Sequence, residues 1–342
     1  MAEYINIKGQ NIEVVASDPA NPTVGQIWYN STSNTLKAFN LTTVGAWATG
    51  GNLVNGKSSH AAANNGTQTA SVTFGGYGPP ASPGITADTQ NYDGSSWTTS
   101  GNMGSARYDL GGAGTQTAAL AIAGFTASPY NKSVIVEAYD GSTWSPAPSL
   151  TGSLISRNSG LGTQTAALNI TGAITSGFDQ PAISACEEYD GTSWTSTGSV
   201  GTARSFVGTA GIQTAGLAIG GNSGVSPPNV ASALTEEYNG STWTAGGAMA
   251  TARSNLGGAG TQTAGLAFGG DQLPGSSDST EEYDGTSWTA GGTLPFANNA
   301  LRGAGTSNTA ALSIGGNGTP TKTTTLEYNG AGQPNTVTIT AS

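Results

Sequence analysis

The chain has 342 residues, of which 53 are glycine and only 9% are charged, against about 25% charged in a typical soluble domain. Its formal net charge of −10 provides no basic surface, which argues against nucleic acid or an anionic membrane as a partner. The only cysteine is Cys186 and the only histidine is His60, which excludes a disulfide framework and a His/Cys zinc site. No apolar run reaches 18 residues and no secretory signal opens the chain, so we expect synthesis in a cytoplasm and no membrane span.

The first fifty residues predict a small β module. They contain a strand within 21–30 (NPTVGQIWYN), a Ser-Thr-Ser-Asn turn, a strand within 34–40 (NTLKAFN) and a strand that begins at Trp47. This segment resembles the NPxxGxxWYNxxxNxLK segment, followed by Trp, that is common in bacteriophage tail-fibre and other virion proteins. The resemblance implies that the chain is part of a phage particle. Residues 1–50 would then attach it to other virion proteins or mediate oligomerisation of the chain.

A unit of about 48 residues then recurs six times, which is typical of repeat architectures. Each unit carries a Gly-Thr-Gln-Thr-Ala turn or a variant of it, at 66–70, 114–118, 162–166, 211–215, 260–264 and 305–310. Each of the first five turns is followed by a Tyr and then a Trp, namely Tyr92 and Trp97, Tyr139 and Trp144, Tyr189 and Trp194, Tyr238 and Trp243, and Tyr283 and Trp288. The last unit has Tyr328 and no Trp.

Each unit predicts four antiparallel strands. The strand after the turn alternates bulky and small residues, as in 118–122 (AALAI), and this pattern suits stacked sheets in which a bulky face meets a small face. The third strand ends at the Tyr. An Asp-Gly or Asn-Gly pair then predicts a tight hairpin, and the Trp opens the fourth strand. Without helical periodicity, four strands in each of six units favour a β-propeller, since ring closure protects sheet edges.

The glycine doublets after the second strand, as at Gly75-Gly76 and Gly269-Gly270, followed by Glu-x-Tyr-Asp and a Trp, resemble kelch repeats. The resemblance covers residues 51–342, although two doublets become Ala123-Gly124 and Thr171-Gly172. We therefore expect an all-β chain: a module at 1–50 and a six-bladed kelch-like β-propeller at 51–342. In the alternative, residues 26–50 supply strands of a seventh or closing blade and pair with 336–340.

The repeated polar and aromatic residues are expected to be structural. One Trp at the same place in each unit indicates packing between blades. Eight of the ten glutamates lie just before the repeat Tyr. We expect them to cap backbone donors or to pair with Arg107, Arg204 and Arg253, which share one repeat position.

Binding is expected on one face of the propeller. Chain direction places the uniform Gly-Thr-Gln-Thr and Asp-Gly turns on one rim and the dissimilar second-to-third-strand loops on the other. Loops on a rigid scaffold are where recognition is normally built. The candidate binding residues in these loops are Tyr77, Phe125, Tyr130, Asn131, Lys132, Phe178, Asp179, Asp271 and Gln272.

No catalytic or metal site is expected. A copper site on a kelch propeller would need several histidines, and a Ser-His-Asp triad would need His60 to meet its partners by chance. Glycoside hydrolysis needs two carboxylates about 5–10 Å apart, and the variable face carries only Asp88, Asp179, Asp271 and Asp278, no more than two in any loop. We therefore expect a non-enzymatic protein without a cofactor.

Two functions follow from these expectations. In the first, the chain is a tail fibre or other virion appendage whose propeller binds a glycan or envelope protein of the host surface. In the second, it is a decoration or adaptor subunit that binds other virion proteins. A glycan-processing enzyme is a third and weaker alternative.

Overall fold

The computed structural model describes residues 12–41, 44–78, 84–127, 131–152, 156–173, 182–223, 230–272, 274–318, 322–331 and 334–339. These residues form an all-β structure without helices. The chain divides into two compact units. We call Met1–Gly45 with Gly330–Ser342 the terminal domain, and Ala46–Asn329 the repeat domain.

The described residues of the repeat domain form six four-stranded antiparallel sheets, numbered I to VI. Sheet I contains β5 (Ala61–Ala62), β6 (Ser71–Phe74), β7 (Thr89–Tyr92) and β8 (Trp97–Ser100), and sheet II contains β9 (Gly111–Thr115), β10 (Ala118–Ile122), β13 (Val136–Tyr139) and β14 (Trp144–Ala147). Sheet III contains β15 (Ser159–Gly162), β16 (Ala167–Ala173), β17 (Ala182–Tyr189) and β18 (Trp194–Thr197), and sheet IV contains β19 (Gly208–Ile212), β20 (Ala215–Ile219), β21 (Thr235–Tyr238) and β22 (Trp243–Ala245). Sheet V contains β23 (Gly257–Thr261), β24 (Ala264–Phe268), β27 (Thr280–Tyr283) and β28 (Trp288–Ala290), and sheet VI contains β29 (Arg302–Ser307), β30 (Ala310–Ile314), β31 (Thr325–Asn329) and β4 (Ala46–Thr49).

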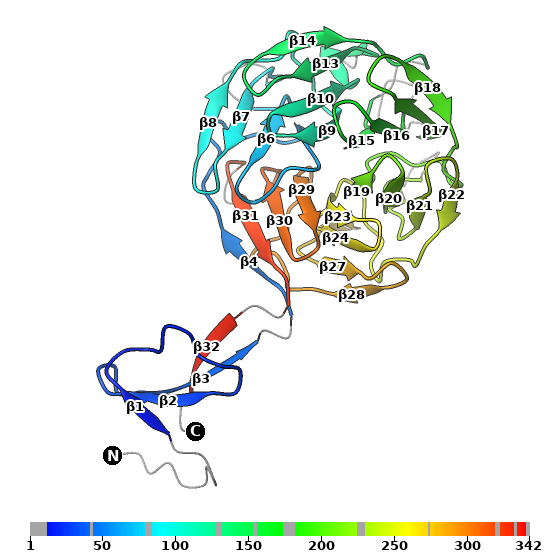
Figure 1. Ribbon diagram of the computed structural model, residues 1–342. Coiled ribbons are helices and arrows are strands. Elements are labelled where there is room, and N and C mark those ends of the chain that lie inside the picture. The colour runs from blue at the N-terminus through cyan, green and yellow to red at the C-terminus, as the bar shows by residue number, and fades with distance from the viewer. Residues whose placement is uncertain are drawn as a thin grey trace. The chain divides into compact units, whose positions relative to one another are not determined.

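The six sheets have a β-propeller-like arrangement, with their first strands toward a common centre (Figure 1). The central strands contact one another in succession, β5 with β9, β9 with β15, β15 with β19, β19 with β23, β23 with β29, and β29 with β5. Two short hairpins lie outside the sheets, β11 (Phe125–Ala127) with β12 (Asn131–Lys132) and β25 (Asp271–Gln272) with β26 (Gly275–Ser276).

The core lies between the sheets and follows the alternation in the sequence. Val72 and Phe74 of sheet I pack with Ala119 and Ala121 of sheet II in one cluster. On the other face of β10, Leu120 and Ile122 pack toward Ala167 and Trp194 of sheet III. The bulky face of one sheet therefore meets the small face of the next, as the pattern predicts.

The last sheet is completed by a strand from the beginning of the chain. Tyr328 on β31 pairs with Trp47 on β4, and their ring centres lie 4.9 Å apart. Trp47 therefore occupies the place of the Trp that the sixth repeat lacks. The sequence predicts a domain boundary between residues 50 and 51. In the structure this boundary lies between residues 45 and 46, and residues 330–342 belong to the terminal domain.

The terminal domain has one four-stranded sheet, in the order β1 (Glu13–Val15), β2 (Ile27–Asn30), β3 (Thr35–Leu41) and β32 (Pro334–Ile339). Phe39 pairs with Thr336 across β3 and β32. The pairing of the first fifty residues with the C-terminal segment therefore occurs, but in a separate sheet rather than in a further repeat sheet.

The motif residues of the terminal domain converge on Asp18. Its Oδ1 accepts hydrogen bonds from Trp28 Nε1 at 3.1 Å and Asn30 Nδ2 at 2.7 Å, and its Oδ2 pairs with Lys37 Nζ at 2.5 Å. These bonds to the charged form lower the pKa of Asp18 to about 2, the bond from Lys37 contributing most. The residues that carry the virion resemblance thus stabilise this small domain.

The terminal domain is expected to lose stability in acid. Because the folded-state pKa of Asp18 lies below the ordinary value of 3.8, its contribution is complete above about pH 4 and is lost as the pH falls through about 2. The indole N–H signal of Trp28, followed by NMR, would report this loss. In the Asp18→Asn variant the acid-dependent change should be absent, and an unchanged titration in that variant would contradict the assignment.

The repeated glutamine joins each of sheets I to V to the sheet before it. Gln164 Nε2, after β15, donates to Ala119 O at 3.2 Å and to Tyr139 O at 2.7 Å in sheet II. Four further turns make the same pair of bonds, through Gln68, Gln116, Gln213 and Gln262. Gln68 of sheet I reaches sheet VI in this way.

The Gln164→Ala variant is expected to lower the free energy of unfolding of the repeat domain by about 1–2 kcal/mol, because it removes two hydrogen bonds to backbone carbonyls. Urea denaturation would measure the change. Thr165→Ala is the matched control, since Thr165 lies exposed in the same turn. Equal effects of the two substitutions would contradict a joining role for the glutamine.

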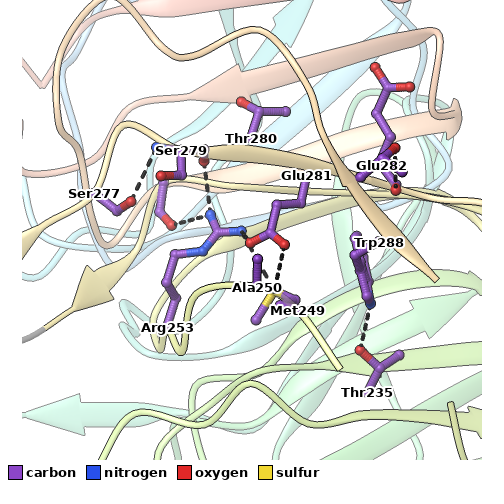
Figure 2. Close-up of polar contacts among 12 residues, drawn as sticks. Thr235, Met249, Ala250, Arg253, Ser277, Ser279, Thr280, Glu281, Glu282 and Trp288 are labelled. Carbon is purple, nitrogen blue, oxygen red and sulfur yellow. Dashed lines mark hydrogen bonds and ion pairs between the residues drawn. The ribbon is translucent and has the colours of Figure 1, made fainter. Parts of the chain in front are cut away.

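The arginine and glutamate pairs predicted from the repeat are formed and buried. Arg253 Nη2 pairs with Glu281 Oε1 at 2.9 Å, and Nη1 donates to Gly269 O and Ser279 O, while Glu281 Oε2 accepts the N–H of Ala250 (Figure 2). Arg107 with Glu137 and Arg204 with Glu236 repeat this pattern.

The repeated Trp also has a structural role. Trp288 Nε1 of sheet V donates to Thr235 Oγ1 of sheet IV at 2.9 Å (Figure 2). Trp144 donates to Thr89 of sheet I in the same way. The prediction that these residues pack between neighbouring sheets is confirmed.

Candidate functional site

The second residue before each central strand belongs to a ring of left-handed residues, which we call the central ring. Its members are Ser59, Asp109, Arg157, Phe206, Asn255 and Ala300, with φ between 48° and 57°. The backbone N–H of each donates to the carbonyl of the preceding member, and Ser59 donates to Ala300, at 2.8–3.1 Å. The six bonds form a complete cycle. The side chains on this cycle differ in every unit, whereas the surrounding turns repeat.

A cavity of about 470 Å³ lies beside the central ring, lined by residues of units III to VI. Three ring members line it, Arg157, Phe206 and Asn255. The other lining residues come from the segments around the second-to-third-strand loops and from the segment before β29, and include Asn222, Asp271, Gln272, Ser276 and Asn299. A concave site of 300–1,000 Å³ with a few convergent polar groups is what small-ligand sites require.

Arg157 is the cationic group of this cavity. Its guanidinium carbon lies 5.1 Å from the ring centre of Phe206 and 6.0 Å from that of Phe125. Its Nε lies 3.9 Å from Asp109 Oδ2, too far for a hydrogen bond. In the described part of the chain, no group accepts a hydrogen bond from this guanidinium. Aromatic faces therefore hold Arg157 in place, with Nε buried toward Asp109 and the two terminal nitrogens without a hydrogen-bond acceptor among the described residues.

Asp271 is the carboxylate of the cavity. Asn255 Nδ2 donates to its Oδ2 at 3.4 Å, and Asn299 Nδ2 donates to its Oδ1. Burial raises the pKa of Asp271, and the two amides oppose that shift. These bonds fix the orientation of the carboxylate and leave each oxygen with capacity to accept another donor.

Of the predicted binding residues, Asp271 and Gln272 line the cavity. Tyr77 packs against Tyr108 with its ring tilted by 50° and 4.3 Å between ring centres. Phe125 is 1% exposed and packs on the other side of Tyr108, so its ring supports Arg157 and is closed to a ligand.

The remaining predicted residues lie elsewhere. Asn131 is exposed and Lys132 half-buried on β12, where Lys132 pairs with Phe125. Burial lowers the pKa of Lys132. Tyr130, Phe178 and Asp179 lie outside the described residues.

Apart from Asp271 and Gln272, the cavity-lining residues were not predicted. Four of them are Arg157, Phe206, Asn255 and Asn299. They lie in the connections between sheets, just before the central strands, and not in the second-to-third-strand loops. A partial signal for three of them exists in the sequence. Five residues before the Gly of the turn, units II to V hold four different residues, Asp109, Arg157, Phe206 and Asn255.

The other groups that bear on chemistry are buried. His60 is fully buried, and burial lowers its pKa well below 6.5. Asp88 pairs with Lys57 at 2.8 Å. Among the described ranges, no group of three His, Cys, Asp or Glu residues could hold a metal ion, and no helix in them could cross a membrane.

Comparison with known proteins adds no relative to this description. The chain matches no protein-family model, and no curated protein is similar enough in sequence to count as a relative.

Proposed function

We propose that the repeat domain is a closed six-bladed kelch-like β-propeller and that the protein is a non-enzymatic bacteriophage virion protein, a tail fibre or another appendage, that binds a host surface receptor. Two observations support the ring. The central strands contact one another in an unbroken succession, and the six backbone bonds of the central ring return to their starting residue. In such a ring, side chains that differ between units gather around one mouth of the axis.

The observation that carries the binding function is the cavity beside that mouth. It combines a cation, a carboxylate, amides and an aromatic ring from four successive units, whereas the repeated turns offer the same groups six times. The virion assignment rests on the resemblance of residues 21–47 to virion segments. Attachment to other virion proteins would then be the role of the terminal domain.

Adsorption to cells tests this function. The purified full chain, fluorescently labelled, would be mixed with a panel of Gram-negative and Gram-positive bacteria, and competition with phage infection would be measured on any strain that it binds. We expect adsorption to some strains and inhibition of phage there. The Phe206→Ala, Asp271→Asn double variant should lose adsorption and keep its thermal unfolding temperature.

The opposite outcome is equally informative. A chain that adsorbs to no strain of the panel, but whose deletion from the phage prevents assembly or destabilises the particle, would contradict receptor binding and favour the decoration or adaptor role.

A further inference from the structure

We infer that the cavity binds an acidic saccharide, a hexuronic acid unit whose carboxylate pairs with Arg157 and whose hydroxyl groups donate to Asp271. This inference rests on the proposed receptor-binding function and names the chemistry of its ligand. It is argued from the two charged side chains of the cavity and from what separates them.

The first step concerns Arg157. A guanidinium is a planar fork of donors that matches a carboxylate in a bidentate manner. Its side chain is 11% exposed, Phe125 and Phe206 face the guanidinium, and Asp109 Oδ2 lies on its Nε side at 3.9 Å, beyond hydrogen-bond distance. Such an arrangement keeps the fork oriented while its hydrogen-bonding capacity remains for a ligand. A carboxylate is therefore a fitting complement of this fork.

The second step concerns Asp271. A carboxylate has about four acceptor positions, and the amides of Asn255 and Asn299 use one on each oxygen. One acceptor position therefore remains on each oxygen of Asp271. Two neighbouring hydroxyl groups of a sugar ring can donate to these two positions. Because a half-buried carboxylate would repel a second anion, the hydroxyl end of the ligand, and not its acid end, must face Asp271.

The third step concerns the space between the two groups. Arg157 precedes sheet III, whereas Asp271 follows β24 of sheet V, so the unit of sheet IV lies between them in the chain order. That unit contributes Phe206 and Asn222 to the lining. A volume of about 470 Å³ lies within the range of small-ligand sites. A ligand that is acidic at one end and hydroxylated at the other fits this order of groups.

Calorimetry on the full chain tests the inference. The probes are trimers of galacturonate, glucuronate and mannuronate, with the methyl esters of the same trimers and maltotriose as neutral probes. We expect at least one acidic trimer to bind, and its methyl ester to bind at least about tenfold more weakly. Arg157→Gln should weaken the acidic trimer by about 10- to 100-fold and leave the ester unchanged. Asp271→Asn should weaken both.

Lys322→Gln provides the matched control, because Lys322 is an exposed cation that does not line the cavity, and binding should be unchanged. If Arg157→Gln lowers the unfolding temperature, Arg157→Lys is used instead, because it keeps the charge but not the planar fork of donors. It should bind the acidic trimer more weakly than the unchanged chain and more tightly than Arg157→Gln. The inference fails if no acidic trimer binds, or if acid and ester bind equally. If the saccharide inference fails in this way but the chain still adsorbs to cells, the proposed receptor function holds with another ligand. If the chain does not adsorb to cells either, both proposals are contradicted.

Discussion

Replacing Arg253 with alanine is expected to lower the free energy of unfolding of the repeat domain by about 3–5 kcal/mol. The substitution leaves the carboxylate of Glu281 buried without its cation, and breaking a buried pair from one side costs this much. It also removes the donor to two carbonyls, Gly269 O and Ser279 O. Burial lowers the pKa of Arg253 and the charge of Glu281 opposes that shift, so each group depends on its partner. Denaturation by urea would measure the loss.

Two variants control for this effect. Lys322→Ala removes an exposed cation and should change stability by less than about 0.5 kcal/mol. The double variant Arg253→Met, Glu281→Leu replaces both charges with apolar groups and should be more stable than Arg253→Ala. A cost of Arg253→Ala no larger than that of Lys322→Ala would contradict the role given to the pair.

The Gly303→Ala variant is expected to destabilise the repeat domain by about 3 kcal/mol, at the upper end of the usual cost of overpacking. A Cβ at this position would lie 2.1 Å from the carbonyl oxygen of Gly258. Gly303 belongs to β29 of sheet VI and Gly258 to β23 of sheet V. Since backbone faces backbone, the clash is relieved only by moving the two central strands apart.

Gly275→Ala is the matched control, because a Cβ at Gly275 would have no neighbour within 4 Å. We expect it to leave the unfolding temperature unchanged. A stable Gly303→Ala variant would show that the central strands do not approach one another as closely as described.

Much of the repeat could be predicted because local rules specify it. The alternation in 118–122, the Asp-Gly hairpins and the shared position of Arg253 and Glu281 each follow from short-range sequence patterns. These residue types favour an arrangement in which the bulky face of one sheet packs against the small face of the next and each buried arginine pairs with a buried glutamate.

The completion of sheet VI could not be predicted with the same rules. Trp47 and Tyr328 are far apart in the sequence, and Trp47 follows a segment that resembles a virion motif. The alternative in which residues 26–50 supply strands of a closing blade is confirmed for β4 of sheet VI, whereas the expected pairing of those residues with 336–340 forms in another sheet. The pairing of Trp47 with Tyr328 is a long-range contact, and no local pattern specifies its partner.

The cavity was predicted only in part, for a physical reason. Asp271 and Gln272 lie in a variable loop, where recognition is expected. Arg157 and Phe206 have left-handed backbones without being glycine, which no propensity rule would predict. That they line the same cavity as Asn299 depends on the arrangement of four successive units around a centre.

Hydrogen–deuterium exchange of the full chain, with and without the envelope polysaccharide of a strain that adsorbs it, tests the central claim most directly. The account predicts protection in peptides from 205–223 and 253–276, which contain most of the residues that line the cavity, and none in the repeated turns at 162–166 and 190–194. Protection confined to those turns or to the terminal domain would contradict binding at the mouth of the ring.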